Sequence, residues 1–425
     1  MGEQGRAGEV GPGTGSGRVG GAGSPATAAS AARPGRRLVP AGRIVGLDVA
    51  RALALVGMIA THMLPSTDPD GGVAVAQQVA GGRASALFAV LAGVSLALMS
   101  GRSTPVRGTE AWAVSAGLAV RALLIAVLGL LLGSLPSGIL VILAYYGVLF
   151  LLGIPFIRLG AGSLALLAVV WVAVVPVLLQ LLRPHLPEAP IASPTLGSLA
   201  DPLGLLAQLT VTGTYHAIPW LAYLFVGMAL GRLDLGRPDR DGSGWHRWRP
   251  ARDLVLLGAG LALVSWSVSR VLLARPGVRE RLEETLTGPY AGNLPFALDH
   301  GLYGTTPTGT WWWLAVDTPH TATPVDLAAT IGSALLVIGI SLAVGTALPR
   351  AASIAFGAGA MTLSLYTCHL VLRTPELLPD QNAGTFFAHV AIVLLIGAAY
   401  RLEGRSGPLE RAVTSAARRT TDRFR

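Results

Sequence analysis

Long apolar runs recur along most of this chain, and they constrain its fold more than any other feature. Each is long enough to cross the hydrocarbon core of a bilayer, which takes about 20 helical residues. Because the runs are continuous and do not alternate, they predict helices, not the strands of a membrane barrel. Pro219 is a candidate break in one run and Gly332 a candidate bend in another. The expected fold is an all-α, polytopic bundle with ten membrane helices, at 44–64, 84–100, 117–135, 137–157, 160–182, 205–231, 253–274, 324–348, 352–373 and 383–402.

The composition excludes a soluble protein of this size. Hydrophobic residues make up 52% of the 425 residues and charged residues only 13%, against roughly 25% charged in ordinary globular domains. A net charge of +9 could suggest a nucleic-acid partner, but every basic residue is an arginine, and the arginines lie in short segments between apolar runs. The expected partner is therefore the lipid bilayer, with no nucleic acid. A single cysteine, Cys368, excludes an intramolecular disulfide and a cysteine-based zinc site.

The distribution of arginine also predicts how the chain is oriented. Six arginines lie between positions 232 and 252, and seven between 401 and 425. An excess of arginine marks cytoplasmic segments. With an even number of crossings, both termini are expected in the cytoplasm and the protein in the plasma (inner) membrane. The expected parts are a disordered tail at 1–42, a membrane domain at 43–402 with a long outer loop at 275–323, and a basic tail at 403–425.

The first apolar run carries three ionisable residues, which are costly inside a membrane and tend to mark sites. Asp48 and Arg51 are three positions apart and can pair on a helix. His62 lies about 16 Å further along and points the same way as Arg51 within about 20°. Arg121, in the third run, could join Arg51 in holding phosphate groups, because guanidinium suits that ligand. The alternatives are a topogenic ion pair, a hydrogen-bonded interfacial histidine and a snorkelling arginine.

Most of the other histidines map to the outer side of the predicted bundle, which indicates a site that faces outward. Their spacing contains no HExxH pair, so no metal is expected. The outer loop also carries a tryptophan triplet at 311–313. Such a triplet is more often an interfacial anchor than a sugar-stacking platform. The outer histidines are His185, His216, His300, His320, His369 and His389, whereas His246 is on the cytoplasmic side.

Several stretches resemble a known family of membrane enzymes. Residues 43–62 read RIVGLDVARALALVGMIATH. This resembles the first helix of the bacterial relatives of heparan-α-glucosaminide N-acetyltransferase, which contains Leu-Asp-x-x-Arg-Gly-x-Ala and ends in histidine. Further stretches that resemble the same group are FAVLAG at 88–93, ILAYYG at 142–147, PHTATP at 319–324 leading into GSAL at 332–335, MTLSLY at 361–366 and GPLE at 407–410.

The resemblance implies transfer of an acetyl or other acyl group from acyl-CoA to a sugar or other cell-envelope acceptor. His62 and His320 are the candidates for a general base, because imidazole titrates near neutral pH. Two positions depart from the family pattern. The animal enzyme has its catalytic histidine in the loop before the second helix, whereas residues 63–82 contain none, and Ala52 stands where the family has glycine. The candidate substrate-binding residues are Asp48, Arg51, Arg121, His216, Tyr145 and Tyr366.

Two other classes of function are compatible with this sequence. A transporter or flippase for a lipid or small solute could line its path with the polar stripe of the first helix. It would act without CoA, and its broken helices would resemble those of many transporters. A non-catalytic membrane scaffold would use the Asp48–Arg51 pair only structurally. The acceptor and the oligomeric state are not specified by any motif.

Overall fold

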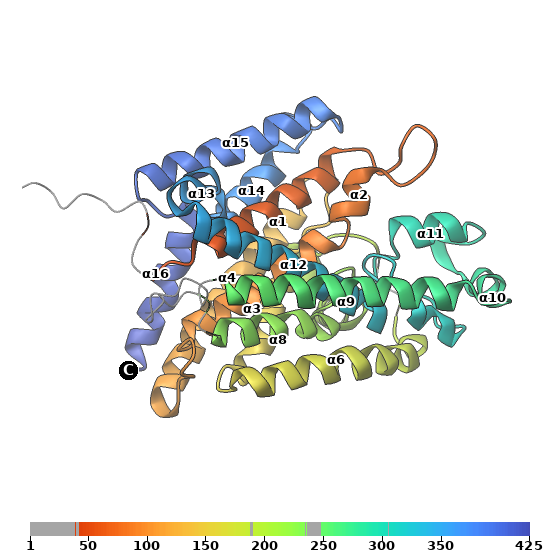
Figure 1. Ribbon diagram of the computed structural model, residues 1–425, viewed down its shortest axis with the longest axis horizontal. Coiled ribbons are helices and arrows are strands. Elements are labelled where there is room, and N and C mark those ends of the chain that lie inside the picture. The colour runs from red at the N-terminus through yellow and green to blue at the C-terminus, as the bar shows by residue number, and fades with distance from the viewer. Residues whose placement is uncertain (1–38, 40–41, 188–189, 234, 236–247, 305) are drawn as a thin grey trace, which may run out of the picture. The chain divides into compact units, whose positions relative to one another are not determined.

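The computed structural model describes residues 39, 42–187, 190–233, 235, 248–304 and 306–425. This part of the chain is helical, as predicted, and its one β-contact is an isolated bridge between Thr67 and Val73. The predicted tail at 1–42 lies outside the described residues, except for positions 39 and 42. The fold is that of a polytopic helical membrane bundle (Figure 1).

Seven predicted runs form single helices that are long and apolar enough to cross a membrane. Their outer faces carry many exposed Leu, Val and Phe side chains, which suits contact with lipid. A short helix, α2 (Val75–Ala80), leads into the second of them. The seven spans are α1 (Val45–Met63), α2 continued by α3 (Arg83–Met99), α4 (Gly108–Gly133), α6 (Ala161–Leu182) with the 3₁₀ turn that follows it, α9 (Arg249–Leu273), α12 (Pro324–Ala347) and α15 (Ala383–Leu402).

The other three predicted runs are not single helices, and this part of the prediction is wrong. A glycine lies at the interruption of each run, at Gly138, Gly213 and Gly357, because glycine readily adopts backbone conformations outside the helix. The run at 137–157 contains only α5 (Leu143–Gly153) and a 3₁₀ turn at Ile154–Phe156. The run at 205–231 splits into α7 (Pro202–Ala207), a π-helical turn at Gln208–Thr212 and α8 (Ala217–Arg232). The run at 352–373 splits into α13 (Pro349–Ala355), a 3₁₀ segment at Gly357–Ala360 and α14 (Thr362–Leu372).

The two positions that were expected to distort helices behave differently. Pro219 lies in the first turn of α8, where a missing N–H costs nothing, and the break falls before it, at 213–216. Gly332 does not interrupt α12. Instead it lets α12 approach α9 closely, since a Cβ at this position would lie 2.5 Å from the nitrogen of Ala262.

The predicted outer loop at 275–323 is largely folded. It contains α10 (Val278–Thr285), α11 (Leu294–His300) and 3₁₀ turns at Gly288–Tyr290 and Trp311–Ala315. Trp313 is fully buried in a small core of its own and donates a hydrogen bond from its indole nitrogen to Thr285 Oγ1 at 3.0 Å. The interpretation of all three tryptophans as interfacial anchors is therefore wrong for Trp313, and Trp311 is the exposed member.

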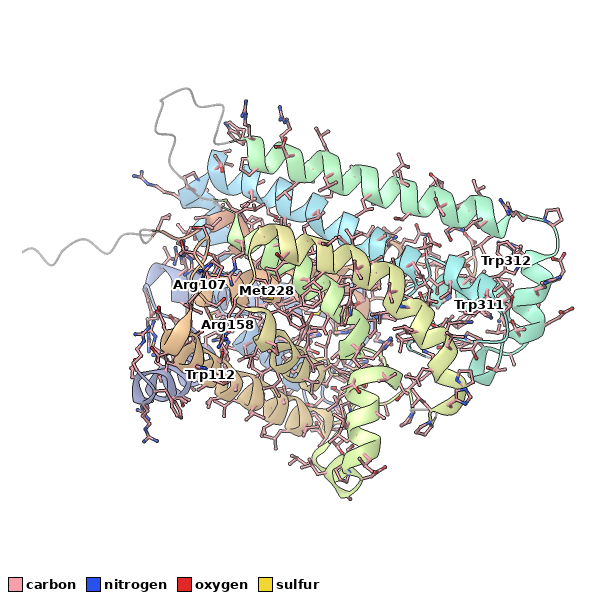
Figure 2. The ribbon with its side chains drawn as sticks, turned by 90° about the horizontal axis from the view of Figure 1, so that it is seen from below. Arg107, Trp112, Arg158, Met228, Trp311 and Trp312 are labelled. Carbon is pink, nitrogen blue, oxygen red and sulfur yellow. The ribbon has the colours of Figure 1, made fainter. Side chains whose placement is uncertain are left out.

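Exposed tryptophans lie at both ends of the bundle. Trp112 is at one end, whereas Trp311, beside the half-buried Trp312, is at the other (Figure 2). The Arg158 guanidinium is 5.6 Å from the centre of the Trp112 ring. Tryptophan is enriched where a membrane protein meets the two bilayer surfaces. The positions of these side chains therefore suit a bundle that crosses the bilayer between them.

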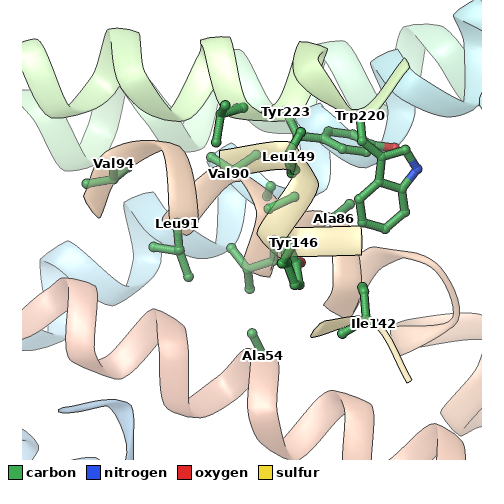
Figure 3. Packing of buried hydrophobic residues seen from close by; sticks show 14 of the residues in the cluster. Ala54, Ala86, Val90, Leu91, Val94, Ile142, Tyr146, Leu149, Trp220 and Tyr223 are labelled. Carbon is green, nitrogen blue, oxygen red and sulfur yellow. The ribbon is translucent and has the colours of Figure 1, made fainter. Parts of the chain in front are cut away.

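The centre of the bundle is the packing of α3 against α5 and α8. Val90, Leu149 and Trp220 are buried there, next to Tyr146 and Tyr223 (Figure 3). The backbones of α3 and α8 are in direct contact at their closest point, at Gly227. A Cβ on this glycine would collide with the carbonyl oxygen of Val90. Small residues allow this close approach of helices within a membrane.

Arg232, the last residue of α8, is buried and links three segments at one end of the bundle. Its guanidinium donates hydrogen bonds to main-chain carbonyls in the last turn of α3 and just after that helix. It also donates to two carbonyls in the segment after α5. The sequence places this residue among the cytoplasmic surface arginines, but the side chain is inside the protein. The acceptor carbonyls are those of Ala97, Ser100, Arg102, Ile157 and Leu159.

The basic tail forms a helix, α16 (Pro408–Arg423), that packs against α4. It is amphipathic, and its Val413 is buried. Near its start, Glu410 reaches the N-terminus of α14, where it accepts hydrogen bonds from the main-chain N–H of Leu363 and Ser364 at 2.8 and 3.1 Å. A carboxylate at a helix N-terminus is stabilising, so this contact fixes α16 to the bundle.

Candidate functional site

A cavity of about 420 Å³ opens beside the first half of α1. Its volume lies within the range of about 300–1,000 Å³ that is typical of small-molecule sites. α1, α3, α4, α5, α14 and the 3₁₀ segment at Gly357–Ala360 form the walls. We call this side of the protein the arginine end, because Arg43, Arg51, Arg102 and Arg121 line the cavity there.

Asp48 is the buried anchor of the arginine end. It is 5% exposed and forms ion pairs with two arginines, Arg43 at 2.5 Å and Arg51 at 3.3 Å. Arg51 also donates a hydrogen bond to Ser95 Oγ on α3 at 2.9 Å. The main chain of Gly359 packs so closely on Asp48 that a Cβ at this glycine would collide with the Asp48 carbonyl. The arrangement holds the Arg51 guanidinium rigidly in the wall of the cavity.

The arginine end carries more positive than negative charge. Four guanidinium groups line the cavity, against the carboxylates of Asp48 and Glu410. Glu410 is itself held by α14, since Ser364 Oγ donates to it at 2.5 Å. Arg121 has a buried Nε without a hydrogen-bond partner in the described part of the chain. Excess guanidinium with unused donors suits a ligand that carries phosphate groups.

A second, much smaller cavity of about 30 Å³ lies beyond the first. His62 from α1 and His320 from the loop before α12 both line it, and we call this side the histidine end. Met58, Ile142 and Tyr366 line both cavities. The two spaces are therefore neighbours that have these three side chains in common. Two residues that are 258 positions apart in the chain, His62 and His320, thus meet at one site.

His62 is held through one ring nitrogen only. Its Nδ1 lies 3.1 Å from Nε2 of His369 on α14, and the two rings are stacked. Behind them, Nδ1 of His369 lies 2.8 Å from Nδ1 of His389 on α15. Nε2 of His62 has no hydrogen bond to any described residue, and the side chain borders the small cavity. This nitrogen therefore remains available for a hydrogen bond at the small cavity.

His320 is held by aromatic rings and by a strained backbone. Its ring stacks on Tyr303 at 5.3 Å and meets the edge of Tyr215 at 5.3 Å. Its φ angle is +61°, which is uncommon for a residue with a side chain. Burial disfavours the charged imidazolium and lowers the pKa of His320 to about 4. The ring is consequently neutral at physiological pH.

The loop that carries His320 is fixed at both ends. Asp326, in the first turn of α12, accepts a hydrogen bond from the Ala322 N–H at 2.9 Å, and Thr323 Oγ1 caps the same helix. On its other side the loop rests on Gly82, the residue before α3, where a Cβ would lie 3.1 Å from Pro319. Gly82 has a φ of +69° as well, so two reasons require glycine there. His320 thus stands at the start of α3.

Two of the candidate residues from the sequence lie outside both cavities. His216 is buried at the start of α8, where Nδ1 is 2.6 Å from the Gly213 carbonyl and Nε2 is 3.3 Å from Arg183. Tyr145 is buried against Tyr215, and its neighbour Tyr146 lines the large cavity instead. The remaining candidates, Asp48, Arg51, Arg121, Tyr366, His62 and His320, line one cavity or the other.

Sequence reasoning missed several residues of the site. Arg43 and Ser95 complete the Asp48–Arg51 arrangement, and Glu410 closes the cavity from α16. Glu410 lies in a stretch, GPLE at 407–410, that resembles the family, so the sequence held a signal for it. The contact between His369 and His389 could also have been expected, because both residues were placed on the outer side of the bundle. Over the described residues, no group of three or more His, Cys, Asp or Glu side chains could hold a metal ion.

A polytopic helical bundle with a cationic cavity that leads to a pair of imidazoles defines a class of membrane protein with a small-molecule site inside the bundle. Comparison with protein families specifies it further. The chain belongs to the family of the heparan-alpha-glucosaminide N-acetyltransferase catalytic region, whose model matches residues 43–266. The match includes α1 to α8 and most of α9, whereas His320, His369 and His389 lie beyond it. No curated protein matches the chain.

Proposed function

We propose that this protein is an acyltransferase that moves an acetyl or other acyl group from acyl-CoA to a sugar or another cell-envelope acceptor. One observation carries the proposal: a cationic cavity and a cavity with two histidines share the wall formed by Met58, Ile142 and Tyr366. The family is one of membrane acetyltransferases, which supports this class of reaction.

The arginine end would bind the phosphate groups of the donor. Arg51 and Arg121 would donate charge-assisted hydrogen bonds to phosphate oxygens, which are stronger than bonds between neutral groups. Asp48 would orient Arg51, as their 3.3 Å contact indicates. The acyl-bearing arm of CoA would then run along α1, past Tyr366, toward His62. Eleven residues separate Arg51 from His62, a distance of about 16 Å along a helix.

The histidine end would carry out the transfer. Nε2 of His62, which has no partner among the described residues, would take the proton from the acceptor hydroxyl or amine as that group attacks the thioester carbonyl. His320 is neutral, so its ring N–H would donate a hydrogen bond to the oxygen that becomes negative. The C–S bond then breaks, and the leaving thiolate takes the proton from His62. The products are the acylated acceptor and CoA.

The position of His320 also fits the departure from the family pattern. The family resemblance places a catalytic histidine in the loop before the second membrane helix, and residues 63–82 contain none. His320 reaches the same end of that helix, α3, from a different part of the chain and rests against Gly82. We infer that His320 supplies an imidazole where the animal enzyme has one in the earlier loop.

The orientation of the protein follows from the donor. CoA is a cytoplasmic molecule, so the arginine end would face the cytoplasm of a cell with the protein in its plasma membrane. The arginine-rich segments then lie on the cytoplasmic side, as the positive-inside rule requires. The acceptor would approach from the opposite side, where His62 and His320 lie.

The proposal is tested with purified full-length protein in nanodiscs and acetyl-CoA labelled in the acetyl group. We expect label transfer to members of a panel of amino sugars, sugar alcohols and simple amines, and loss of transfer in His62→Ala and His320→Ala. His185→Ala, an exposed histidine, serves as the matched control. Transfer that is unchanged in both variants would remove their roles. Movement of a labelled lipid or solute across the bilayer without CoA would instead indicate a transporter.

A further inference from the structure

Three histidine side chains form a line from the small cavity into the bundle. They come from three helices that lie side by side, α1, α14 and α15 (Figure 1). The contacts run from His62 Nδ1 to His369 Nε2 at 3.1 Å and from His369 Nδ1 to His389 Nδ1 at 2.8 Å. The last ring ends at a main-chain oxygen, since His389 Nε2 lies 3.3 Å from the carbonyl of Leu378. His369 and His389 are fully buried.

The rings in this line are neutral. None of the three forms an ion pair with another described residue, and a buried charge without a partner is costly. The positive charge of Arg373, at the end of α14, acts on all three rings and also opposes an imidazolium. Each ring therefore has one nitrogen that carries a hydrogen and one that accepts a hydrogen bond.

The carbonyl of Leu378 then sets the direction of every hydrogen bond in the line. A carbonyl only accepts, so Nε2 of His389 carries its hydrogen and Nδ1 of His389 is the acceptor. His369 must donate from Nδ1 to that acceptor, which leaves Nε2 of His369 to accept in turn. His62 must consequently donate from Nδ1. The lone pair of His62 is left on Nε2, the nitrogen without a described partner beside the small cavity.

We propose that His369 and His389 are positioning residues that hold His62 in its Nδ1–H tautomer, with Nε2 free as the base that takes the proton of the acceptor. This inference rests on the proposed function for its catalytic consequence, but the tautomer itself does not. In many sites a carboxylate or carbonyl accepts a hydrogen bond from one nitrogen of an imidazole and so fixes the tautomer in which the other nitrogen reacts. Here two further imidazoles and a carbonyl take the place of a carboxylate.

The line also gives a route by which the positive charge of the captured proton can leave the cavity. When Nε2 of His62 takes the proton of the acceptor, the Nδ1 proton of His62 can pass to Nε2 of His369. The Nδ1 proton of His369 then passes to Nδ1 of His389, whose ring becomes the imidazolium. The charge is thus moved from the cavity to the ring that bonds the Leu378 carbonyl. The reverse transfers return a proton to Nδ1 of His62, whose ring is then the imidazolium and can give its Nε2 proton to the leaving thiolate.

The test is the tautomer of His62 in full-length protein labelled with ¹⁵N-histidine in nanodiscs, read from the ring nitrogen shifts and assigned by the signal lost in His62→Gln. We expect the Nδ1–H form in the wild type. His389→Leu removes the last acceptor, so we expect the His62 signal to shift toward a mixture of both tautomers. His389→Asn keeps a side-chain acceptor near the position of Nδ1 and should keep the wild-type tautomer.

Acetyl transfer provides the second measurement. We expect kcat to fall about tenfold or more in His389→Leu with little change in KM for acetyl-CoA, and to recover largely in His389→Asn. A His62 that carries its hydrogen on Nε2 in the wild type would overturn the proposal, and so would equal tautomers in wild type and His389→Leu. If the wild type has the Nδ1–H form but transfers no acetyl group, the positioning inference holds and the proposed function fails.

Discussion

The two ends of the site differ in both charge and space. At the arginine end, four guanidinium groups surround a cavity of about 420 Å³. At the histidine end, two imidazoles border about 30 Å³, roughly the volume of one or two water molecules. His62 and His320 have no carboxylate partner among the described residues, whereas Asp48 pairs with two arginines.

Under the proposed function, this difference would separate recognition of the donor from the chemistry of transfer. Fixed charges in a roomy cavity suit a large anionic group that must enter and leave, because they attract it without close fit. Uncharged imidazoles in a tight space suit proton transfer and exclude water. A substitution at one end should therefore change binding of the donor, and one at the other end should change the rate of transfer. The predictions below are ordered by expected effect and test that separation.

The largest effect is expected for His62→Ala. Loss of a general base typically lowers the rate by a factor of roughly 10² to 10⁴. The fall should appear in kcat for acetyl transfer, with KM for acetyl-CoA nearly unchanged, because His62 lies away from the arginines. Steady-state kinetics with the purified protein provide the measurement. A large rise in KM with constant kcat would mean that the two ends are not separate in function.

The complementary change is Arg51→Gln. Hydrogen bonds to charged groups contribute about 1.5–3 kcal/mol, so KM for acetyl-CoA should rise roughly 10–100-fold while kcat changes little. Binding should also depend less on salt than in the wild type. Arg107→Gln is the matched control, since Arg107 is exposed outside the cavity. Equal effects of the two substitutions would argue against a donor site at Arg51.

The neutral state of His320 predicts a pH dependence of stability. In the folded protein its pKa is about 4, because burial lowers it from 6.5. Between these values the unfolded chain binds a proton at His320 and the folded chain does not, so stability is lost as pH falls from 6.5 toward 4. At pH 5 the loss is about 2 kcal/mol or less.

This pH effect is measured by comparing thermal unfolding of wild type and His320→Asn at pH 7 and pH 5. Asn cannot take the proton, so the variant should lose less thermal stability between these two values than the wild type does. An identical shift of Tm in both proteins would show that His320 is not held neutral by burial between Tyr215 and Tyr303.

The smallest effect is expected for Glu410→Gln. The substitution removes a charge from the N-terminus of α14, which costs about 1 kcal/mol, and should lower Tm by a few degrees. It also removes a carboxylate from the cationic cavity, so acetyl-CoA should bind slightly more tightly. Glu403→Gln, on an exposed residue, is the control. Weaker CoA binding in Glu410→Gln would show that Glu410 takes part in holding the donor.

The sequence predicts the helical class and the seven uninterrupted membrane helices, since both depend on local apolar length. The Asp48–Arg51 contact is likewise predicted, because spacing along one helix determines it. The contact between His62 and His369, in contrast, joins residues 307 positions apart through the packing of α1 on α14. A break was expected in only one of the three interrupted runs, and at Pro219 instead of 213–216, because hydropathy records the length of an apolar segment and not its backbone geometry at glycine.

The buried guanidinium of Arg232 bears on how far this bundle can move. It joins the end of α8 to carbonyls at the end of α3 and in the turn after α5. An alternating-access cycle that rocked α8 away from α3 would leave a charged group and several carbonyls without partners, at a cost of about 1–3 kcal/mol for each. We therefore expect α8 and the end of α3 to move together, so that the donor of the proposed reaction would enter by side-chain and loop rearrangements.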